Sequence, residues 1–144
     1  MSTLTNEEAK NYCRMEKKYL GNNMFYMPGE VHIPLHSVDR ECEFILTVRI
    51  NRVELTKASF QNRVRKSVVL LRIDLGGRMH RNPNHEDVPC PHIHIYKDGY
   101  DARWAYPLPS EFSDPSDAFK TLQEFMDYCN ITLKPPIQKG LELY

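Results

Sequence analysis

The chain has 144 residues, enough for one domain, and its apolar fraction of 41% can support a packed core. Nineteen basic and nineteen acidic residues give a formal net charge of zero, which argues against a dedicated nucleic-acid coat protein. The charge is nevertheless uneven, because residues 40–81 hold ten basic and four acidic residues, whereas residues 86–144 hold five basic and ten acidic ones. The basic middle still allows a local anion-binding surface.

The cysteine pattern and the absence of long apolar segments indicate in which cellular compartment the protein is expected. Four cysteines stand far apart and form no CxxC pair, which is typical of thiols in a reducing environment rather than of a disulfide framework. The first residues carry no apolar stretch of the signal-peptide type, and no segment has the length of a transmembrane helix. We expect a cytoplasmic protein that does not associate with membranes.

The first half of the chain predicts one helix followed by strands. A helix is expected over about residues 6–20, because Thr5 and Glu8 fit a capping box and Gly21 stops the apolar repeat. A short edge strand is expected at 31–35, a clearly alternating strand at 43–51 and a weaker one at 55–65. The nearly continuous apolar run at 67–75 suits a central strand.

The second half predicts a long loop, a hairpin and a second helix. Residues 76–89 form a loop long enough to be functional or mobile, and a β-hairpin follows it. The next helix is expected to be capped by Asp114, with Pro115 in its first position, and a final short strand is expected in the tail. The prediction is a single α+β domain, 1–144, with an N-terminal helix, a mainly antiparallel sheet of about five or six strands containing the hairpin, and a C-terminal helix packed on the sheet.

The predicted hairpin separates apolar from polar side chains. If Asp98 and Gly99 form a two-residue turn, His94 pairs with Arg103 and Ile93 pairs with Trp104. One side is then apolar, with Trp104 as a core anchor. The other side collects the groups that can carry chemistry: His92, His94, Tyr96, Asp101 and Arg103.

This polar side has three alternative interpretations. His92 and His94 can supply two ligands to a divalent metal such as zinc, with Cys90 and His85 as further candidate ligands. The two histidines can instead exchange protons with a phosphodiester, while Arg103 holds the phosphate and Tyr96 donates a hydrogen bond or stacks on a base. The third interpretation is a solvated sheet face with no chemistry.

A wider binding surface is also predicted from the basic middle of the chain. Arg72 lies inside an apolar strand, so its guanidinium should reach water, a sheet edge or an acidic partner. The surface would combine this arginine with residues of the loop and hairpin: His80, Arg78, Arg81 and Asp101. Neutralisation of these charges by the acidic C-terminal part of the same chain is the alternative.

Part of the sequence resembles a known group of proteins. The features are the apolar strand ending at Asp74, His80 and Asn82-Pro83 in the loop, the Pro91-His92-Ile93-His94 run and the strand from Trp104 to Leu108. Together with the helix that follows and the Pro-Pro tail, they resemble an uncharacterised family of small bacterial and prophage proteins over about two thirds of the chain. A stretch of about fifteen residues is also similar to proteins encoded near toxin–antitoxin systems.

The resemblance implies a mobile-element or host–phage conflict setting. The function expected from the residues is binding of a nucleic acid or protein partner through the surface of His92, His94 and Arg103. The alternative is a nuclease that cleaves phosphodiesters with or without a metal. A structural or inhibitor protein without chemistry is a third class that is compatible with all of these residues.

Overall fold

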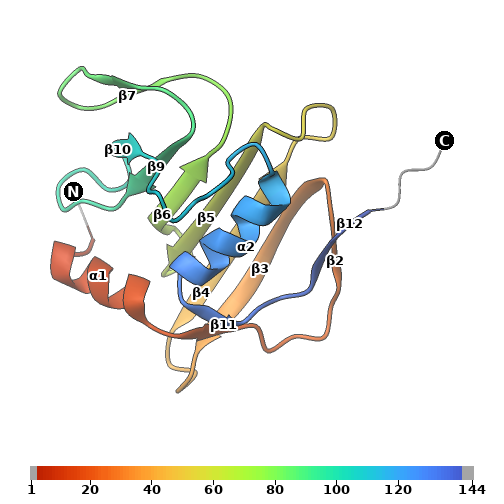
Figure 1. Ribbon diagram of the computed structural model, residues 1–144. Helices are drawn as coiled ribbons and strands as arrows, with labels where there is room; N and C mark the ends of the chain where they lie inside the picture. Colours follow the sequence, from red (N-terminus) through yellow and green to blue (C-terminus); the bar gives the residue numbers. More distant parts are fainter. Residues whose placement is uncertain (1–2, 141–144) are drawn as a thin grey trace.

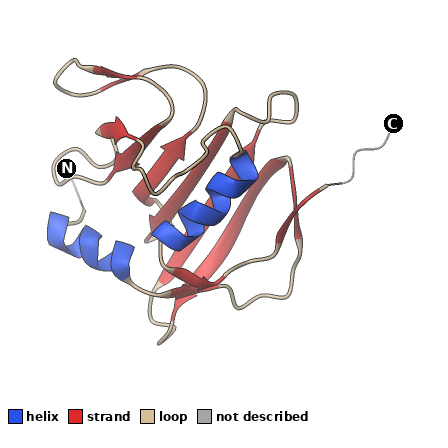
Figure 2. Ribbon diagram, viewed as in Figure 1, coloured by secondary structure: helices blue, strands red, loops and turns tan. Residues whose placement is uncertain are grey.

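The computed structural model describes residues 3–140 as a curved sheet with helices on one side (Figures 1 and 2). The elements in chain order are α1 (Asn6–Arg14), β1 (Lys17–Lys18), β2 (Phe25–Met27), β3 (Gly29–Ser37), β4 (Glu43–Ile50), β5 (Ala58–Val64), β6 (Val68–Asp74), β7 (His80–Arg81), β8 (Asp87–Val88), β9 (His92–Ile95), β10 (Ala105–Pro107), α2 (Ala118–Tyr128), β11 (Ile131–Leu133) and β12 (Ile137–Lys139). Neither helix in this range is long and apolar enough to cross a membrane.

The main sheet has eight strands in the order β10-β9-β6-β5-β4-β3-β1-β11, and it is antiparallel except between β1 and β11. The α+β class is therefore confirmed, but the prediction of five or six strands is wrong. The additional strands β1 and β11 have only two or three residues each, too few to show a periodic pattern. Two smaller pairs, β12 with β2 and β7 with β8, stand outside this sheet.

Both helices differ from their predicted boundaries. The capping box of Thr5 and Glu8 is present, but α1 ends at Arg14. The residues beyond it join the sheet instead, where the Lys17 amide donates to the Asn130 carbonyl. Helix α2 starts later than predicted, because Asp117 rather than Asp114 is its N-cap and accepts from the Lys120 amide.

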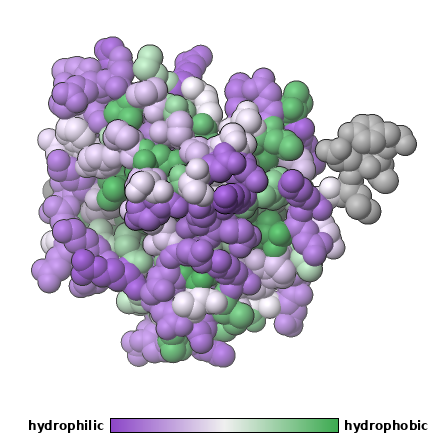
Figure 3. Space-filling view, in the orientation of Figure 1, coloured by the Kyte–Doolittle hydropathy of each residue, from purple (hydrophilic) through white to green (hydrophobic). Residues whose placement is uncertain are grey.

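The hydrophobic core lies between the sheet and α2. The apolar side of β4, which includes Phe44, Leu46 and Val48, is fully buried as its alternation predicts. Phe60 of β5 packs against Phe125 of α2, with ring centroids 6.1 Å apart. Figure 3, in the same orientation as Figure 1, shows that the outer surface on this side is mostly hydrophilic.

The hairpin register differs from the prediction by two residues. His94 pairs with Ala105, and Ile93 pairs with Tyr106. The connection is longer than two residues, because Lys97 bridges to Asp101 and the Arg103 amide then donates to the Tyr100 carbonyl in a second turn. A shift of two residues preserves the sides of the strand, so Ile93 still faces the core and the two histidines still face away from it.

Trp104 is not the core anchor that the sequence predicts. Its indole is half-buried and lies outside the core cluster. The ring packs against Tyr100, with centroids 5.8 Å apart, and the Lys97 ammonium lies 4.5 Å from its centre. In this longer connection, Trp104 therefore packs against residues of its own loop rather than against the core.

Candidate functional site

Two rows of opposed side chains cross the side of the sheet that faces away from α2. Directly paired residues of neighbouring strands share a face, so the pairing from β3 to β9 determines which side chains meet. The first row is His32, Thr47, Gln61, Arg72 and His94, and the second is Glu30, Arg49, Ser59, Asp74 and His92. We call the side of the sheet formed by these ten residues the polar face.

The two rows end in a cluster of four side chains, the Asp74 centre, made of Arg72, Asp74, His92 and His94. Asp74 Oδ2 accepts a hydrogen bond from Arg72 Nη2 at 3.2 Å, and it lies 3.1 Å from His92 Nε2 and 3.2 Å from His94 Nε2. Both histidines are only 1% exposed, whereas the side chains of Asp74 and Arg72 are 22% and 36% exposed. A ligand would therefore meet the carboxylate and the guanidinium first.

Backbone carbonyls orient both histidines. His94 Nδ1 lies 2.9 Å from the Ala102 carbonyl, and His92 Nδ1 lies 3.2 Å from the Val88 carbonyl and 3.3 Å from that of Pro89. A carbonyl oxygen only accepts, so each Nδ1 donates its proton in these contacts. The Nε2 atom of each ring is thereby directed at Asp74.

Asp74 is held in its ionised form. Burial opposes ionisation, but the contacts with His94 and His92 and the positive charge of Arg72 outweigh burial and lower the pKa of Asp74 well below its usual range. Ser59 Oγ donates to the other carboxylate oxygen at 3.0 Å. The centre therefore carries a fixed negative charge next to a guanidinium at neutral pH.

The loop between β6 and β9 covers the histidines. His80 Nε2 donates to the Arg103 carbonyl at 2.6 Å, and its ring centroid lies 4.6 Å from that of His94. The interpretation of His92 and His94 as part of a solvated face is therefore wrong. A strand pattern shows which side a residue faces, but it cannot show that a distant loop folds over that side.

The hairpin residues predicted to accompany the histidines lie elsewhere. The exposed Arg103 guanidinium donates to the Tyr100 and Gly99 carbonyls within its own turn. Tyr96 is buried, and its hydroxyl donates to the Leu4 carbonyl and accepts from the Leu4 amide. Asp101 is exposed, with a φ of 52° in the turn.

The loop residues of the predicted binding and metal sites are also spread out. Arg78 and Arg81 are exposed, and Arg81 pairs with Asp87 across the β7–β8 pair. His85 is exposed between these two strands, at a φ of 72°. Cys90 Sγ lies 3.7 Å from His92 Nδ1, the ring nitrogen that faces away from Asp74. Of the predicted metal ligands, only His92 and His94 lie together at the Asp74 centre.

The sequence interpretation missed Asp74, the residue that joins the centre. One signal was present, because Arg72 and Asp74 stand two residues apart in an otherwise apolar strand and therefore share a face. Their alignment with the histidines depends on β6 pairing with β9 in one register, with Arg72 opposite His94 and Asp74 opposite His92. That register was not predicted from the sequence.

A groove of about 320 Å³ runs along the polar face beside the Asp74 centre. Arginine, hydroxyl and amide side chains line it together with the carboxylate: Thr47, Arg49, Ser59, Gln61, Arg72 and Asp74. Arg63, on the same side of β5, donates from Nη2 to Thr47 Oγ1 at 3.2 Å. The groove thus combines two guanidinium groups, each paired with a carboxylate (Arg49 with Glu30 and Arg72 with Asp74), with neutral hydrogen-bonding groups.

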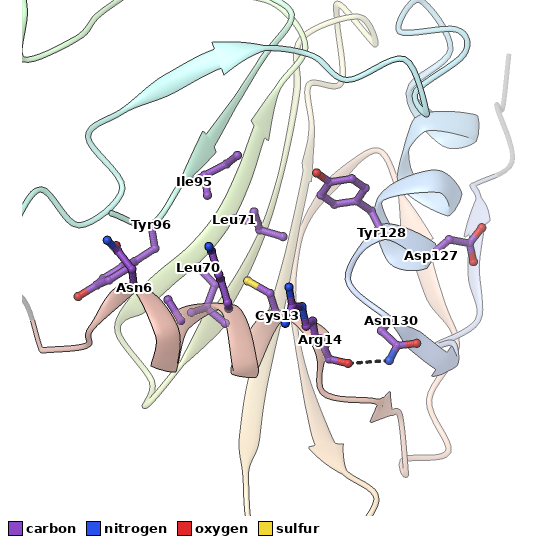
Figure 4. A pocket seen from close by; sticks show the side chains of 12 residues that line it. Asn6, Cys13, Arg14, Leu70, Leu71, Ile95, Tyr96, Asp127, Tyr128 and Asn130 are labelled. Carbon is purple, nitrogen blue, oxygen red and sulfur yellow. Dashed lines mark hydrogen bonds between the residues drawn. The ribbon is translucent and has the colours of Figure 1, made fainter. Parts of the chain in front are cut away.

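A second cavity, of about 570 Å³, lies between α1 and α2 (Figure 4). Cys13 and Leu71 line it from α1 and β6, and Tyr128 lines it from α2. Asn130 Nδ2 donates to the Arg14 carbonyl at its lower rim. This cavity lies on the helical side of the sheet, whereas the Asp74 centre lies on the polar face.

The comparison with protein families places the chain in an uncharacterised group. The model of a family of unknown function, DUF6978, matches residues 4–131, so the chain belongs to this family. No curated protein and no solved structure matches the chain significantly.

Proposed function

We propose that this member of the DUF6978 family binds the phosphate backbone of a nucleic acid in the groove of the polar face. The observation that carries the proposal is the groove itself, in which Arg49 and Arg72 flank hydroxyl and amide groups. A guanidinium recognises phosphate through parallel hydrogen bonds, and neutral polar side chains commonly contact sugars and phosphates. Arg49 and Arg72 therefore take the phosphate-binding role that the sequence prediction gave to Arg103.

The strand geometry supports contact with an extended chain rather than a single anion. Arg49 and Arg72 lie on β4 and β6, which are separated by β5. Neighbouring strands are about 4.8 Å apart, so the two side chains start from positions roughly 10 Å apart. Two guanidinium groups at this separation can each contact a different phosphate of one strand.

Binding can be tested with a fluorescently labelled single-stranded RNA and fluorescence anisotropy. Arg49→Gln and Arg72→Gln should each weaken binding about 10- to 100-fold, since a hydrogen bond to a charged group contributes roughly 1.5–3 kcal/mol. Each should also lower the slope of log affinity against log salt by about 1. Lys10→Gln, which removes a positive charge on α1, is the matched control and should change neither quantity much.

Two results would overturn the binding proposal. One is the absence of salt-dependent binding to single- or double-stranded RNA and DNA. The other is an equal loss of affinity in all three variants, because that would reflect overall charge rather than the groove. An acidic protein partner would become the better candidate if nucleic acids fail and such a partner binds through Arg49 and Arg72.

Cleavage of the bound phosphodiester is a second candidate function. It is favoured by the Asp74 centre, in which two buried imidazoles contact the carboxylate that lines the groove. Imidazoles can transfer protons near neutral pH, and Arg72 can stabilise negative charge on phosphate oxygens. An end-labelled RNA should be cut by the wild type and remain intact with His94→Ala. Equal cutting by both proteins would contradict a catalytic role for the centre.

The biological setting stays a prediction from sequence resemblance. A role in phage, prophage or bacterial conflict would suit a small nucleic-acid-binding protein of this kind. A cytoplasmic location is also an expectation, drawn from the sequence.

A further inference from the structure

Three potential ligand atoms converge within the Asp74 centre. Asp74 Oδ2, His92 Nε2 and His94 Nε2 all lie within 4.8 Å of one another, and the two nitrogens are 3.1 and 3.2 Å from the oxygen. A tetrahedral ion with ligands at 2.0–2.2 Å holds them roughly 3.4 Å apart. We propose that these three residues bind a divalent first-row metal cation such as zinc.

The hydrogen bonds of the histidines support this assignment. Because both Nδ1 atoms donate to backbone carbonyls, each ring presents its Nε2 atom to Asp74. Either protons on these nitrogens or a cation must lie between them and the carboxylate oxygen. Histidines that bind metals usually donate their other ring N–H to a carbonyl or carboxylate, which is the arrangement found here.

Arg72 contacts atoms that would bind the metal, so its guanidinium and a metal ion would compete for them. Its Nη2 atom lies 3.0 Å from His94 Nε2 and 3.2 Å from Asp74 Oδ2, so the guanidinium contacts two of the three ligand atoms. The side chain is 36% exposed and borders the groove. When a cation binds, Arg72 turns into the groove, where it becomes available for the phosphate contact of the proposed function.

The donor set indicates the kind of metal site. Two imidazole nitrogens and one carboxylate oxygen suit zinc and neighbouring transition metals better than calcium or magnesium. Three protein ligands leave a coordination position for water or for an oxygen of a ligand, as in catalytic rather than structural zinc sites. Asp74 thus takes the place that the sequence prediction gave to Cys90 and His85.

Metal titration of the tag-free protein, without nucleic acid, tests the site directly. Isothermal titration with zinc should give one equivalent for the wild type, and the absorption of bound cobalt should lack a thiolate charge-transfer band. Asp74→Asn and His94→Ala should weaken binding about 100-fold or more. His85→Ala, which removes an exposed histidine of the β7–β8 connection, is the control and should bind like the wild type.

A gain of affinity provides a test that misfolding cannot imitate. Arg72→Gln removes the competing positive charge, and it should tighten zinc binding about tenfold. The proposal is overturned if neither the wild type nor Arg72→Gln shows saturable binding, or if Asp74→Asn and His94→Ala bind as tightly as the wild type. If Arg72→Gln binds zinc with the same affinity as the wild type, Arg72 does not compete with the metal.

The proposed metal site and the proposed nucleic-acid groove can be tested and rejected independently of each other. Arg49→Gln lies outside the three ligands and should leave zinc affinity unchanged, while it weakens RNA binding. Loss of zinc binding with intact RNA binding would reject only the metal site. Normal zinc binding without RNA binding would reject only the proposed function.

Discussion

At the scale of single residues, the surroundings decide what each thiol can do. Cys129 is fully buried, and burial raises its pKa to about 12, although the nearby Lys17 acts in the opposite direction. Burial also raises the pKa of Cys90, which Asp74 raises further. A thiol with a raised pKa carries little thiolate at neutral pH, so neither cysteine is suited to nucleophilic chemistry. All four cysteines are free, as the sequence indicates.

The raised pKa of Cys129 predicts a loss of stability at high pH. Above pH 9.0, the ordinary value for this thiol, the unfolded chain loses the proton while the folded chain keeps it. The contribution of Cys129 to the free energy of unfolding should therefore be constant below pH 9 and fall above it, by up to about 1.4 kcal/mol per pH unit. Urea unfolding between pH 7.5 and 10.5 measures this. Cys129→Ala should lack the extra decline, and parallel curves for the two proteins would contradict the prediction.

At the scale of elements, the Asn82 side chain hydrogen-bonds the loop between β6 and β9 to strand β10, next to the Asp74 centre. Asn82 is buried, donates from Nδ2 to the Ala105 carbonyl at 2.9 Å and accepts from the Ala105 amide at 2.8 Å. It thereby satisfies backbone groups of the edge strand β10 in the way that a neighbouring strand would. The Asn82 side chain, rather than a ninth strand, therefore pairs with this edge of the sheet and holds the loop together with the His80 contact.

Asn82→Ala should release the loop without unfolding the domain. Two buried hydrogen bonds are lost, each contributing about 0.5–1.5 kcal/mol. Hydrogen exchange should accelerate about tenfold or more in peptides that contain Ala105, and His92 and His94 should become open to chemical modification. Asn84→Ala, in the same loop but exposed, is the control. Equal protection in both variants would show that other contacts hold the loop.

At the scale of the whole molecule, Lys17 connects the segment after α1 with the end of α2. Its side chain is buried, and Nζ donates to the carbonyls of Cys13 and Met15 at 3.0 and 2.8 Å. The third hydrogen bond, at 2.7 Å, reaches Cys129 at the end of α2. Strand β1 also pairs in parallel with β11, so the N-terminal and C-terminal segments close the sheet together.

Lys17→Met should destabilise the protein although it places an apolar side chain in a buried position. Three buried carbonyls lose their donor, and each unsatisfied group costs about 1–3 kcal/mol before relaxation or water entry. We expect a loss of roughly 2–5 kcal/mol in the free energy of unfolding, measured by urea denaturation. Lys18→Met, at the half-buried neighbouring position, should change stability by less than about 1 kcal/mol. A Lys17→Met protein as stable as the wild type would show that the carbonyls find other donors.

The sequence by itself determined the features that depend on local periodicity. Alternation predicted the buried side of β4, the capping box predicted the start of α1, and the spacing of His92 and His94 predicted that both face away from Ile93. These predictions succeed because a side chain's direction along a strand, and the hydrogen bonds of a helix start, depend on neighbouring residues.

Only the tertiary structure decided which distant groups meet. The turn after β9 is longer than Asp98-Gly99 suggests, so Arg103 does not face His94, and the β6–β9 register brings Asp74 to the histidines instead. The loop that buries the histidines is held by Asn82, more than twenty residues away from its partner. Register and loop packing depend on the total energy of contacts between segments far apart in the chain, and a local pattern does not contain that information.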